Sequence, residues 1–229
     1  NPWLGGRAGR LDVAVDVISD ATGYVQNVDP DHLQAVAEDH DCRVQIVAAP
    51  GAFVRRGEVL ARVDLLHCDD EAQGAFRSAF AIGDSRSYDQ DPRFGLIVLG
   101  EIAAKALSAG INDPGTAIQV IGSGVRLLEE WATRPRPDAP RCDRLLAPSV
   151  SEADLLDDVF GPIARYGSAD VAVAIRLRKG LLSLARLDAL AAPAQALAAE
   201  SLERARRDLP IAADLARVVA VGPDAPSAA

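Results

Sequence analysis

Residues 91–132 read DPRFGLIVLGEIAAKALSAGINDPGTAIQVIGSGVRLLEEWA, and this stretch decides the fold of the chain. It contains the same start signal twice, Asp91-Pro92 and Asp113-Pro114. An aspartate accepts hydrogen bonds from the free N–H groups of a first helical turn, and proline suits the first helical position. We therefore predict two consecutive helices, the first ended by Gly110, because glycine is common just beyond a helix.

Both predicted helices are unusually apolar. Their aliphatic residues cover more than one face of each helix, which predicts that the pair lies at the centre of a helical bundle. Gly100 and Gly122 occupy matching positions in the two segments. Because each glycine costs about 1 kcal/mol of helix propensity, we interpret both as points of close helix packing.

The N-terminal part of the chain has a different pattern. Short alternating or β-branched stretches separated by glycine turns predict strands, and they lie at residues 13–17, 23–28, 43–47 and 59–63. Asp29-Pro30 predicts one helix among them. We therefore expect a small β-rich module, similar to a barrel-sandwich, over residues 11–68.

From about Asp69 onward the pattern is helical, apart from a proline-rich connection with a short strand at residues 144–147. Ser151 predicts a helix start, Ser168 a second, Pro193 an interruption and Pro210 a last start. The fold class predicted for the whole chain is α+β, with the β-rich module followed by a helical bundle over residues 69–221.

Composition narrows the function. The chain has 229 residues and a net charge of -9, and an acidic surface repels phosphate backbones, so we expect no nucleic-acid partner. No apolar run reaches the roughly 20 residues of a spanning helix. Methionine is absent, also at position 1, so we expect a fragment or a processed product. Three widely spaced cysteines predict no disulfide framework and fit a reducing compartment.

No catalytic or cofactor motif is found in the sequence. His40-Asp41-Cys42 and His67-Cys68-Asp69-Asp70 lack the spacing that places two ligands on one side of a metal, so we interpret them as solvated histidines and core cysteines rather than a metal site. Gly122-Ser123-Gly124 has no preceding strand and is no nucleophile elbow. Glycine-rich phosphate loops are absent, and we expect no cofactor.

The candidate binding residues are polar side chains beside the two helix starts. They are Arg86, Gln90, Asp91, Asn112, Asp113 and Thr116. Helix capping and loop hydrogen bonds explain most of them without a ligand. The alternative is a binding site on exposed helix N-termini, which attract anions, although carboxylates already placed there argue against an anion.

Two resemblances can be stated from these residues. The segment 49–60, APGAFVRRGEVL, resembles the half-motif of a biotinyl/lipoyl-type barrel-sandwich, but residues 1–104 contain no lysine to carry a prosthetic group. The segments 83–96 and 101–117, GDSRSYDQDPRFGL and EIAAKALSAGINDPGTA, resemble the signature of a bacterial family of predicted membrane proteins, domain of unknown function 2254. The chain departs from that pattern at Ser87 and Ala109, where threonine and proline are usual.

The family resemblance implies transmembrane helices upstream of this chain, which would be a soluble C-terminal part in the cell membrane. The acidic charge and the cysteines favour the cytoplasmic side. The function that we predict is a regulatory, sensing or assembly module without catalytic activity. One alternative is a small-molecule-binding or hydrolytic enzyme that uses Arg86, Asp91, Asn112 and Asp113. Another is self-association through the apolar helices at 92–109 and 114–132.

Overall fold

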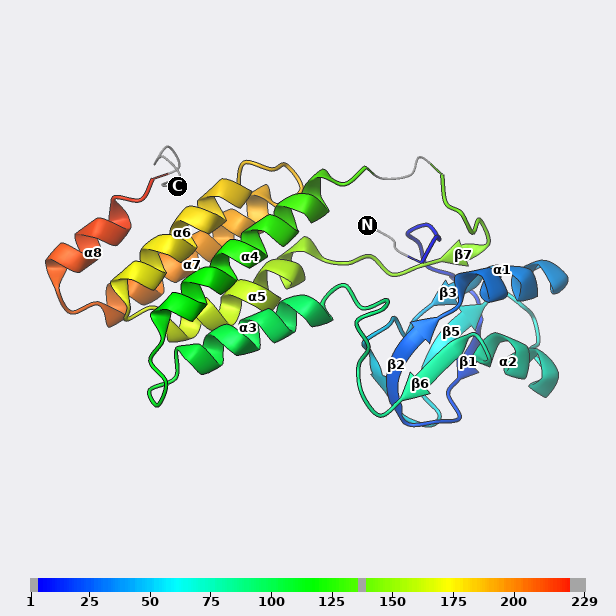
Figure 1. Ribbon diagram of the computed structural model, residues 1–229. Coiled ribbons are helices and arrows are strands. Elements are labelled where there is room, and N and C mark those ends of the chain that lie inside the picture. Colours follow the sequence, from blue (N-terminus) through cyan, green and yellow to red (C-terminus); the bar gives the residue numbers. More distant parts are fainter. Residues whose placement is uncertain (1–3, 136–138, 223–229) are drawn as a thin grey trace. The chain divides into compact units, whose positions relative to one another are not determined.

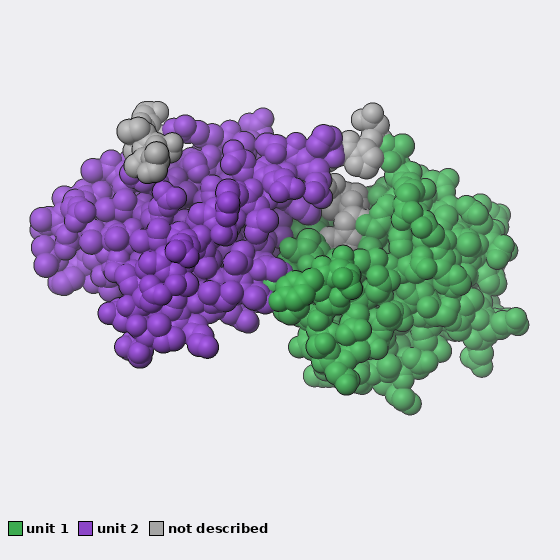
Figure 2. Space-filling model, in the orientation of Figure 1, with its two compact units in different colours: residues 1–94, 136–150 green, residues 95–135, 151–229 purple. Residues whose placement is uncertain are grey.

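Two units make up the chain in the computed structural model, which describes residues 4–135 and 139–222. Unit 1 takes in the described residues of 1–94 and 136–150, and unit 2 those of 95–135 and 151–229 (Figure 2). The chain therefore leaves unit 1, enters unit 2, returns and leaves again. The α+β fold class predicted from the sequence is confirmed. The boundary predicted between residues 68 and 69 marks where the hydrophobic periodicity changes from strand-like to helix-like. The two units instead group residues that contact one another in space.

Unit 1 contains two small sheets and two helices (Figure 1). The four-stranded sheet has the order β1 (Val15–Ile18), β5 (Val59–Val63), β3 (Val44–Ile46) and β7 (Leu145–Leu146). The three-stranded sheet has the order β4 (Phe53–Val54), β2 (Gly23–Val28) and β6 (Phe80–Gly83). All pairs are antiparallel except β3 with β7. The helices are α1 (Pro30–Asp39) and α2 (Asp70–Arg77). The two sheets do not close into a barrel.

The alternation of the strands explains the core of unit 1. Val17, Val25 and Leu60 are fully buried from both sheets, and Phe76 of α2 joins them. Burying one such side chain contributes about 1.5–3 kcal/mol. The cap predicted at Asp29 is confirmed, because its carboxylate accepts hydrogen bonds from two backbone N–H groups of the first turn of α1.

One part of the prediction for unit 1 is wrong. The sequence predicts helix from about Asp69 onward, but β6 at Phe80–Gly83 is a strand that pairs with β2. Its four residues, Phe-Ala-Ile-Gly, are too few for periodicity to separate a strand from a helix. Pairing with a strand more than fifty residues earlier decides its conformation.

Unit 2 consists of six helices in the part of the chain that the structure describes. They are α3 (Phe94–Ala106), α4 (Pro114–Thr133), α5 (Glu152–Tyr166), α6 (Val171–Leu184), α7 (Ala191–Asp208) and α8 (Ala212–Val219). In Figure 1, α4 to α7 run side by side, with α3 along one side of the bundle and α8 beyond α6 and α7. Fully buried side chains from several of these helices fill the space between them, among them Leu128, Phe160 and Leu181.

The predicted close helix contact is confirmed at Gly100 and wrong at Gly122. Pro162 lies inside α5 and has no N–H to donate to the carbonyl of Asp158. A Cβ at Gly100 would collide with that carbonyl oxygen, so α3 can approach α5 here only with glycine. A Cβ at Gly122 would meet no atom closer than 3.9 Å. The tight position on α4 is instead Gly124, where a Cβ would come within 2.9–3.1 Å of side chains of α5.

The helix starts of the C-terminal half agree with the prediction in part. Ser151 caps α5 through the N–H of Asp154, as predicted. The cap of α6 is Asp170 and not Ser168, whose hydroxyl bonds to Asp208 instead. Pro193 does not separate two helices, because it is the third residue of α7. A first helical turn tolerates proline, since its N–H groups have no partner within the helix.

Candidate functional site

Arg86 and Asp91 form a buried ion pair in the loop that follows β6. The guanidinium Nε donates to Asp91 Oδ2 at 2.8 Å, and a second guanidinium nitrogen donates to the same oxygen. The side chain of Asp91 is 2% exposed and that of Arg86 is 22% exposed. The other carboxylate oxygen, Oδ1, accepts the backbone N–H groups of Arg93 and Phe94 at 3.1 and 3.2 Å. Asp91 therefore joins the loop to the start of α3, and both of its oxygens are occupied.

Gly51 lies directly against this ion pair. A Cβ at Gly51 would stand 2.7 Å from Asp91 Cγ and 2.9 Å from a guanidinium nitrogen of Arg86. Gly51 also has φ +90, a conformation that other residues rarely adopt. Its N–H donates to the carbonyl of Val25 in β2 at 2.8 Å. The Pro-Gly turn between β3 and β4 therefore packs directly against the ion pair.

Two aromatic rings cover the same loop. Tyr88 stacks on Phe94 with ring centroids 4.4 Å apart, and the guanidinium of Arg86 lies 5.0 Å from the centroid of Phe94. A cation over an aromatic face contributes about 0.5–2 kcal/mol, depending on how far it is desolvated. The contact with Phe94 favours the orientation in which Arg86 reaches Asp91.

Gln90 pairs with the backbone of β2 as a strand residue would. Its side-chain oxygen accepts the N–H of Val28 at 2.9 Å, and its side-chain nitrogen donates to the carbonyl of Val28 at 3.1 Å. The amide of Gln90 is thereby used at both ends. A donor and an acceptor that satisfy a backbone group in this way position a loop and leave little to offer a ligand.

The second trio of candidate residues lies at the start of α4, in unit 2. Asp113 Oδ1 accepts the N–H of Thr116 at 3.1 Å, and the Thr116 hydroxyl donates to Asp113 Oδ2 at 2.6 Å. The hydrogen bond from the Thr116 hydroxyl, with that from its backbone, holds the pKa of Asp113 below its ordinary value. Asn112 is exposed and has φ +49, a left-handed conformation that asparagine tolerates better than most residues. This trio is a helix cap with its preceding turn.

The six predicted residues therefore form two groups. Arg86, Gln90 and Asp91 come together in unit 1, and Asn112, Asp113 and Thr116 come together in unit 2. Within each group the side chains bond to one another or to backbone. Helix capping, which was one of the two interpretations of these residues, describes Asp113 and Thr116 fully and Asp91 in part.

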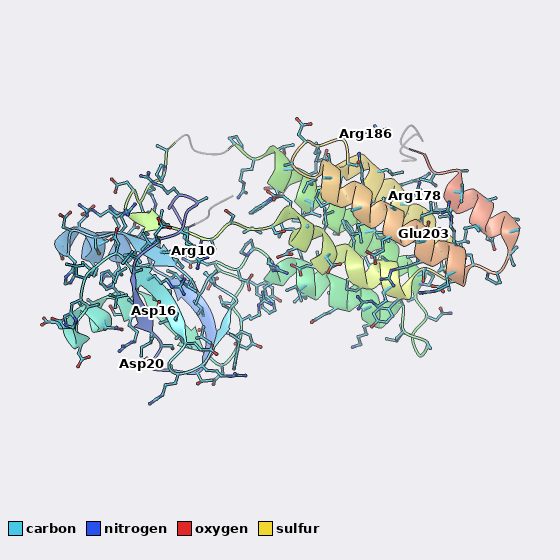
Figure 3. The ribbon with its side chains drawn as sticks, turned by 180° about the vertical axis from the view of Figure 1, so that it is seen from behind. Arg10, Asp16, Asp20, Arg178, Arg186 and Glu203 are labelled. Carbon is cyan, nitrogen blue, oxygen red and sulfur yellow. The ribbon has the colours of Figure 1, made fainter. Side chains whose placement is uncertain are left out.

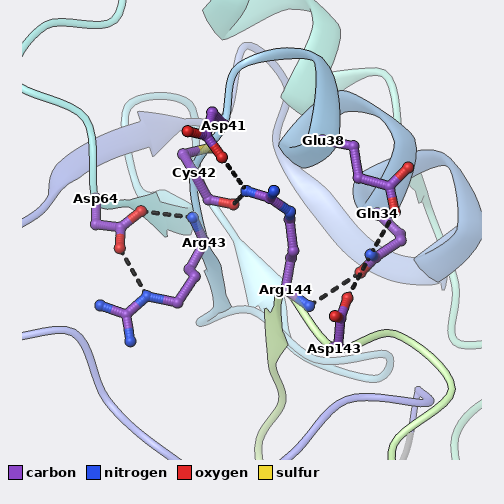
Figure 4. Close-up of polar contacts among 8 residues, drawn as sticks. All are labelled: Gln34, Glu38, Asp41, Cys42, Arg43, Asp64, Asp143 and Arg144. Carbon is purple, nitrogen blue, oxygen red and sulfur yellow. Dashed lines mark hydrogen bonds and ion pairs between the residues drawn. The ribbon is translucent and has the colours of Figure 1, made fainter.

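Sequence reasoning missed a polar network between α1 and the segment that returns from unit 2 (Figure 4). The amide of Gln34 donates to Asp143 and to Glu38, both at 2.7 Å, and its oxygen accepts the N–H of Arg144 at 3.1 Å. The guanidinium of Arg144 donates to Asp41 at 2.9 Å. The only sequence signal is the cluster of charges at residues 141–144, within a connection whose spatial neighbour the sequence does not reveal.

This network fastens the segment that contains β7 to α1 within unit 1 and has no feature of a reactive site. Its ion pair between Arg144 and Asp41 is open to solvent, with side-chain exposures of 32% and 92%, and such a surface pair contributes only about 0–1 kcal/mol. The apolar residues of the returning segment, Leu145 and Leu146, are buried. The polar contacts therefore set which residues meet, and burial supplies most of the stabilisation.

Cys42 and Cys142 are core residues, and Cys68 is partly buried against the core. Burial raises the pKa of the Cys42 thiol to about 11 and also raises the pKa values of Cys68 and Cys142. A raised pKa keeps a thiol protonated and poorly nucleophilic. Across residues 4–135 and 139–222, no three His, Cys, Asp or Glu side chains gather into a group that could hold a metal ion.

Arg178 of α6 is a half-buried cation in unit 2 (Figure 3). Its Nε donates to the carbonyl of Val221 at 2.8 Å, and another guanidinium nitrogen donates to the carbonyl of Ala198 at 3.2 Å. Burial lowers the pKa of Arg178, and the nearby Arg206 lowers it further. Arg178 ties the end of α8 to α6 and α7 through backbone carbonyls.

Comparison with known proteins shows that both signature loops lie within the region matched by one protein family. The model of the family described as "Predicted membrane protein (DUF2254)" matches residues 7–183, which include both trios and the Pro-Gly turn. The chain belongs to this family. The resemblance stated from the sequence is thereby confirmed, and membrane association follows from the description of the family. No established activity comes with it.

The relatives that match this DUF2254 chain are themselves uncharacterised. An uncharacterised protein of Mycobacterium tuberculosis (strain ATCC 25618 / H37Rv) is 33% identical over 188 residues, which cover 76% of this chain and 35% of the relative. An uncharacterised protein of Mycobacterium bovis matches with the same identity and coverage. The chain thus spans about a third of the length of these relatives. No solved structure matches it. None of the helices in the described residues is long and apolar enough to cross a membrane.

Proposed function

We propose that this chain is a regulatory, sensing or assembly module of a bacterial DUF2254 membrane protein and that it has no catalytic activity of its own. The observation that supports the proposal is the bonding of the signature residues. Asp91 uses both carboxylate oxygens within its loop, Gln90 uses both ends of its amide on Val28, and Asp113 uses both oxygens on Thr116. Residues bonded in this way organise a fold, whereas catalytic groups need a face open to substrate.

The alternative enzyme would use Arg86, Asp91, Asn112 and Asp113 around one cleft. It needs these side chains to be available to a substrate, but Arg86 and Asp91 bond to each other, and Asp113 bonds to Thr116. Each pair also has local partners that explain it. No specific observation favours the enzyme over the module.

A ligand screen separates the two functions. Thermal unfolding of the chain would be followed with inorganic phosphate, nucleotides and small carboxylic acids, because a ligand that binds the native state raises its unfolding temperature. We expect no stabilisation by any of them. A stabilisation that disappears in Asp113→Asn or in Arg86→Gln, while the control Arg126→Gln keeps it, would replace the module with a binding site or an enzyme.

We also propose that the module faces the cytoplasm and is attached to the bilayer through an upstream segment. Three free cysteines support a reducing compartment, and the relatives are about three times as long as the matched region, which leaves room for such a segment. Ser85 is exposed in the loop after β6. In the full-length protein, a Ser85→Cys variant should react with a membrane-impermeant maleimide in inverted vesicles and not in intact cells. Unsubstituted protein gives the background from Cys68, and labelling in intact cells would reverse the orientation.

A further inference from the structure

Helix α3 buries mostly small residues and leaves several large ones partly exposed. The residues that it buries in unit 2 are Leu96, Gly100, Ala103 and Ala106. Val98 and Leu99 are only half-buried, and Ile102 is 46% exposed. Glycine and alanine allow α3 to lie close to α5, whereas Val98, Leu99 and Ile102 remain partly exposed to solvent.

Charge on α3 is confined to one turn. Glu101 and Lys105 are its only charged residues, and both are exposed. Their positions on the helix place them beside Val98 and Ile102, because residues three and four apart share a face. A helix that is apolar all round is normally buried. We define the outer face of α3 as Val98, Glu101, Ile102 and Lys105.

We propose that a second copy of this chain docks on the outer face of α3, with the two α3 helices antiparallel about a two-fold axis. In such a pairing the same surface contacts itself. An axis near residue 103 places Glu101 of each copy opposite Lys105 of the other, with Ile102 between the two ion pairs and Val98 beyond them toward the start of the helix. One acidic and one basic residue, one turn apart on an otherwise apolar face, are self-complementary in this arrangement and in no parallel one.

The size of the face sets the expected strength. A 13-residue helix is about 20 Å long, so a pair of them buries less than the roughly 1,200–2,000 Å² of a stable interface. Association of the isolated chain should therefore be weak. Attachment to a membrane would raise the effective concentration of the two copies and strengthen the same contact without new interactions. The proposal goes beyond the non-catalytic role proposed above, since a module could have that role as a monomer.

Charge exchange tests the pairing directly. Sedimentation equilibrium of the chain, from micromolar to millimolar concentration, should show a monomer–dimer equilibrium. Glu101→Lys should weaken it by about tenfold or more, because like charges then face each other, and so should Lys105→Glu. The double variant with both substitutions should restore it, because the pattern is again self-complementary. Ile102→Ser should also weaken it, whereas Ile211→Ser, an exposed isoleucine just before α8, should not.

Each other outcome has a definite meaning. A monomer at every concentration would overturn the proposal, and so would a dimer that Ile102→Ser does not affect. Failure of the double variant to restore association would also reject self-pairing. Circular dichroism melts check that every variant is folded. Binding of the chain to phosphatidylglycerol vesicles that depends on Ile102 would assign the face to the lipid surface instead. The ligand screen described above is independent of these results.

Discussion

Replacing Asp91 by alanine should unfold or open unit 1 more than any other single substitution in the signature. Asp91→Ala removes the anion from a buried ion pair and leaves the guanidinium of Arg86 without its partner. Leaving one member of a fully buried pair typically costs about 3–5 kcal/mol. Because Arg86 is 22% exposed, it can regain part of its hydration, and the low end of that range applies. Loss of the bonds to the N–H groups of Arg93 and Phe94 adds about 0.5–2 kcal/mol. The expected total is about 3.5–5 kcal/mol.

Hydrogen–deuterium exchange, resolved by peptide, measures this loss in each unit separately. This matters because two units need not unfold in one transition. In Asp91→Ala, protection should fall over β2 and over the Pro-Gly turn at Gly51, with a smaller effect on α6. Asp91→Asn keeps a carbonyl oxygen for the backbone N–H groups and removes only the charge, so it should lose less. Arg86→Met combined with Asp91→Ala should cost less than the sum of the two single changes, because no charge is left unpaired.

A loss below about 1 kcal/mol in Asp91→Ala would refute this reasoning. It would mean that Arg86 rehydrates freely and that α3 starts without the carboxylate. The ion pair would then be free for another purpose, and the case for a binding role of Arg86 and Asp91 would be strengthened.

Three further predictions concern other parts of the fold. Gly100→Ala should destabilise unit 2 by about 1–3 kcal/mol, because the methyl group meets a backbone carbonyl of α5; Gly122→Ala, in open space, should stabilise it by about 0.5–1 kcal/mol in urea unfolding. Gln73→Ala removes two hydrogen bonds from the outer edge of β1, and faster amide exchange in β1 with concentration-dependent association should follow. The pKa of Asp208 is lowered to about 2 by Arg207 and by the Ser168 hydroxyl. Ser168→Ala should raise it in a carbon-detected NMR titration, and since the pKa is depressed in the folded state, the stabilisation by this contact is present above pH 4 and is lost as the pH falls toward 2.

The sequence predicted correctly those helices and strands that depend on contacts between residues close together in the chain. Asp29, Asp113 and Ser151 cap the helices predicted at those positions. Each does so by accepting hydrogen bonds from backbone N–H groups two or three residues away, and a contact over so short a distance can be predicted from the local sequence. The strand predicted at residues 43–47 has a local cause too, since its alternation is visible within five residues, and β3 occupies Val44–Ile46.

The candidate site could be predicted only as a set of residues. Arg86 and Asp91 are five positions apart, so their proximity follows from the sequence. The amide of Gln90 forms hydrogen bonds with the backbone of Val28, 62 positions away. The residue packed against the ion pair is Gly51, which belongs to another turn. Neither contact could be predicted from residue types or their spacing, because every residue presents a backbone and the sequence does not show which distant backbone lies nearby.

The sequence alone determined the α+β class, the helix starts at Asp29, Asp113 and Ser151, and the membership of the chain in its family, because caps, alternation and motif spacing are short-range properties. Tertiary structure alone decided which residues share a unit, that β6 is a strand, and that Gly124 rather than Gly122 is the tight point of α4. In each case the deciding contact is with a residue distant in the chain: β6 pairs with β2, and Gly124 faces Val159 and Phe160 of α5. The free energy of such contacts depends on positions in space, and no short window of sequence contains them.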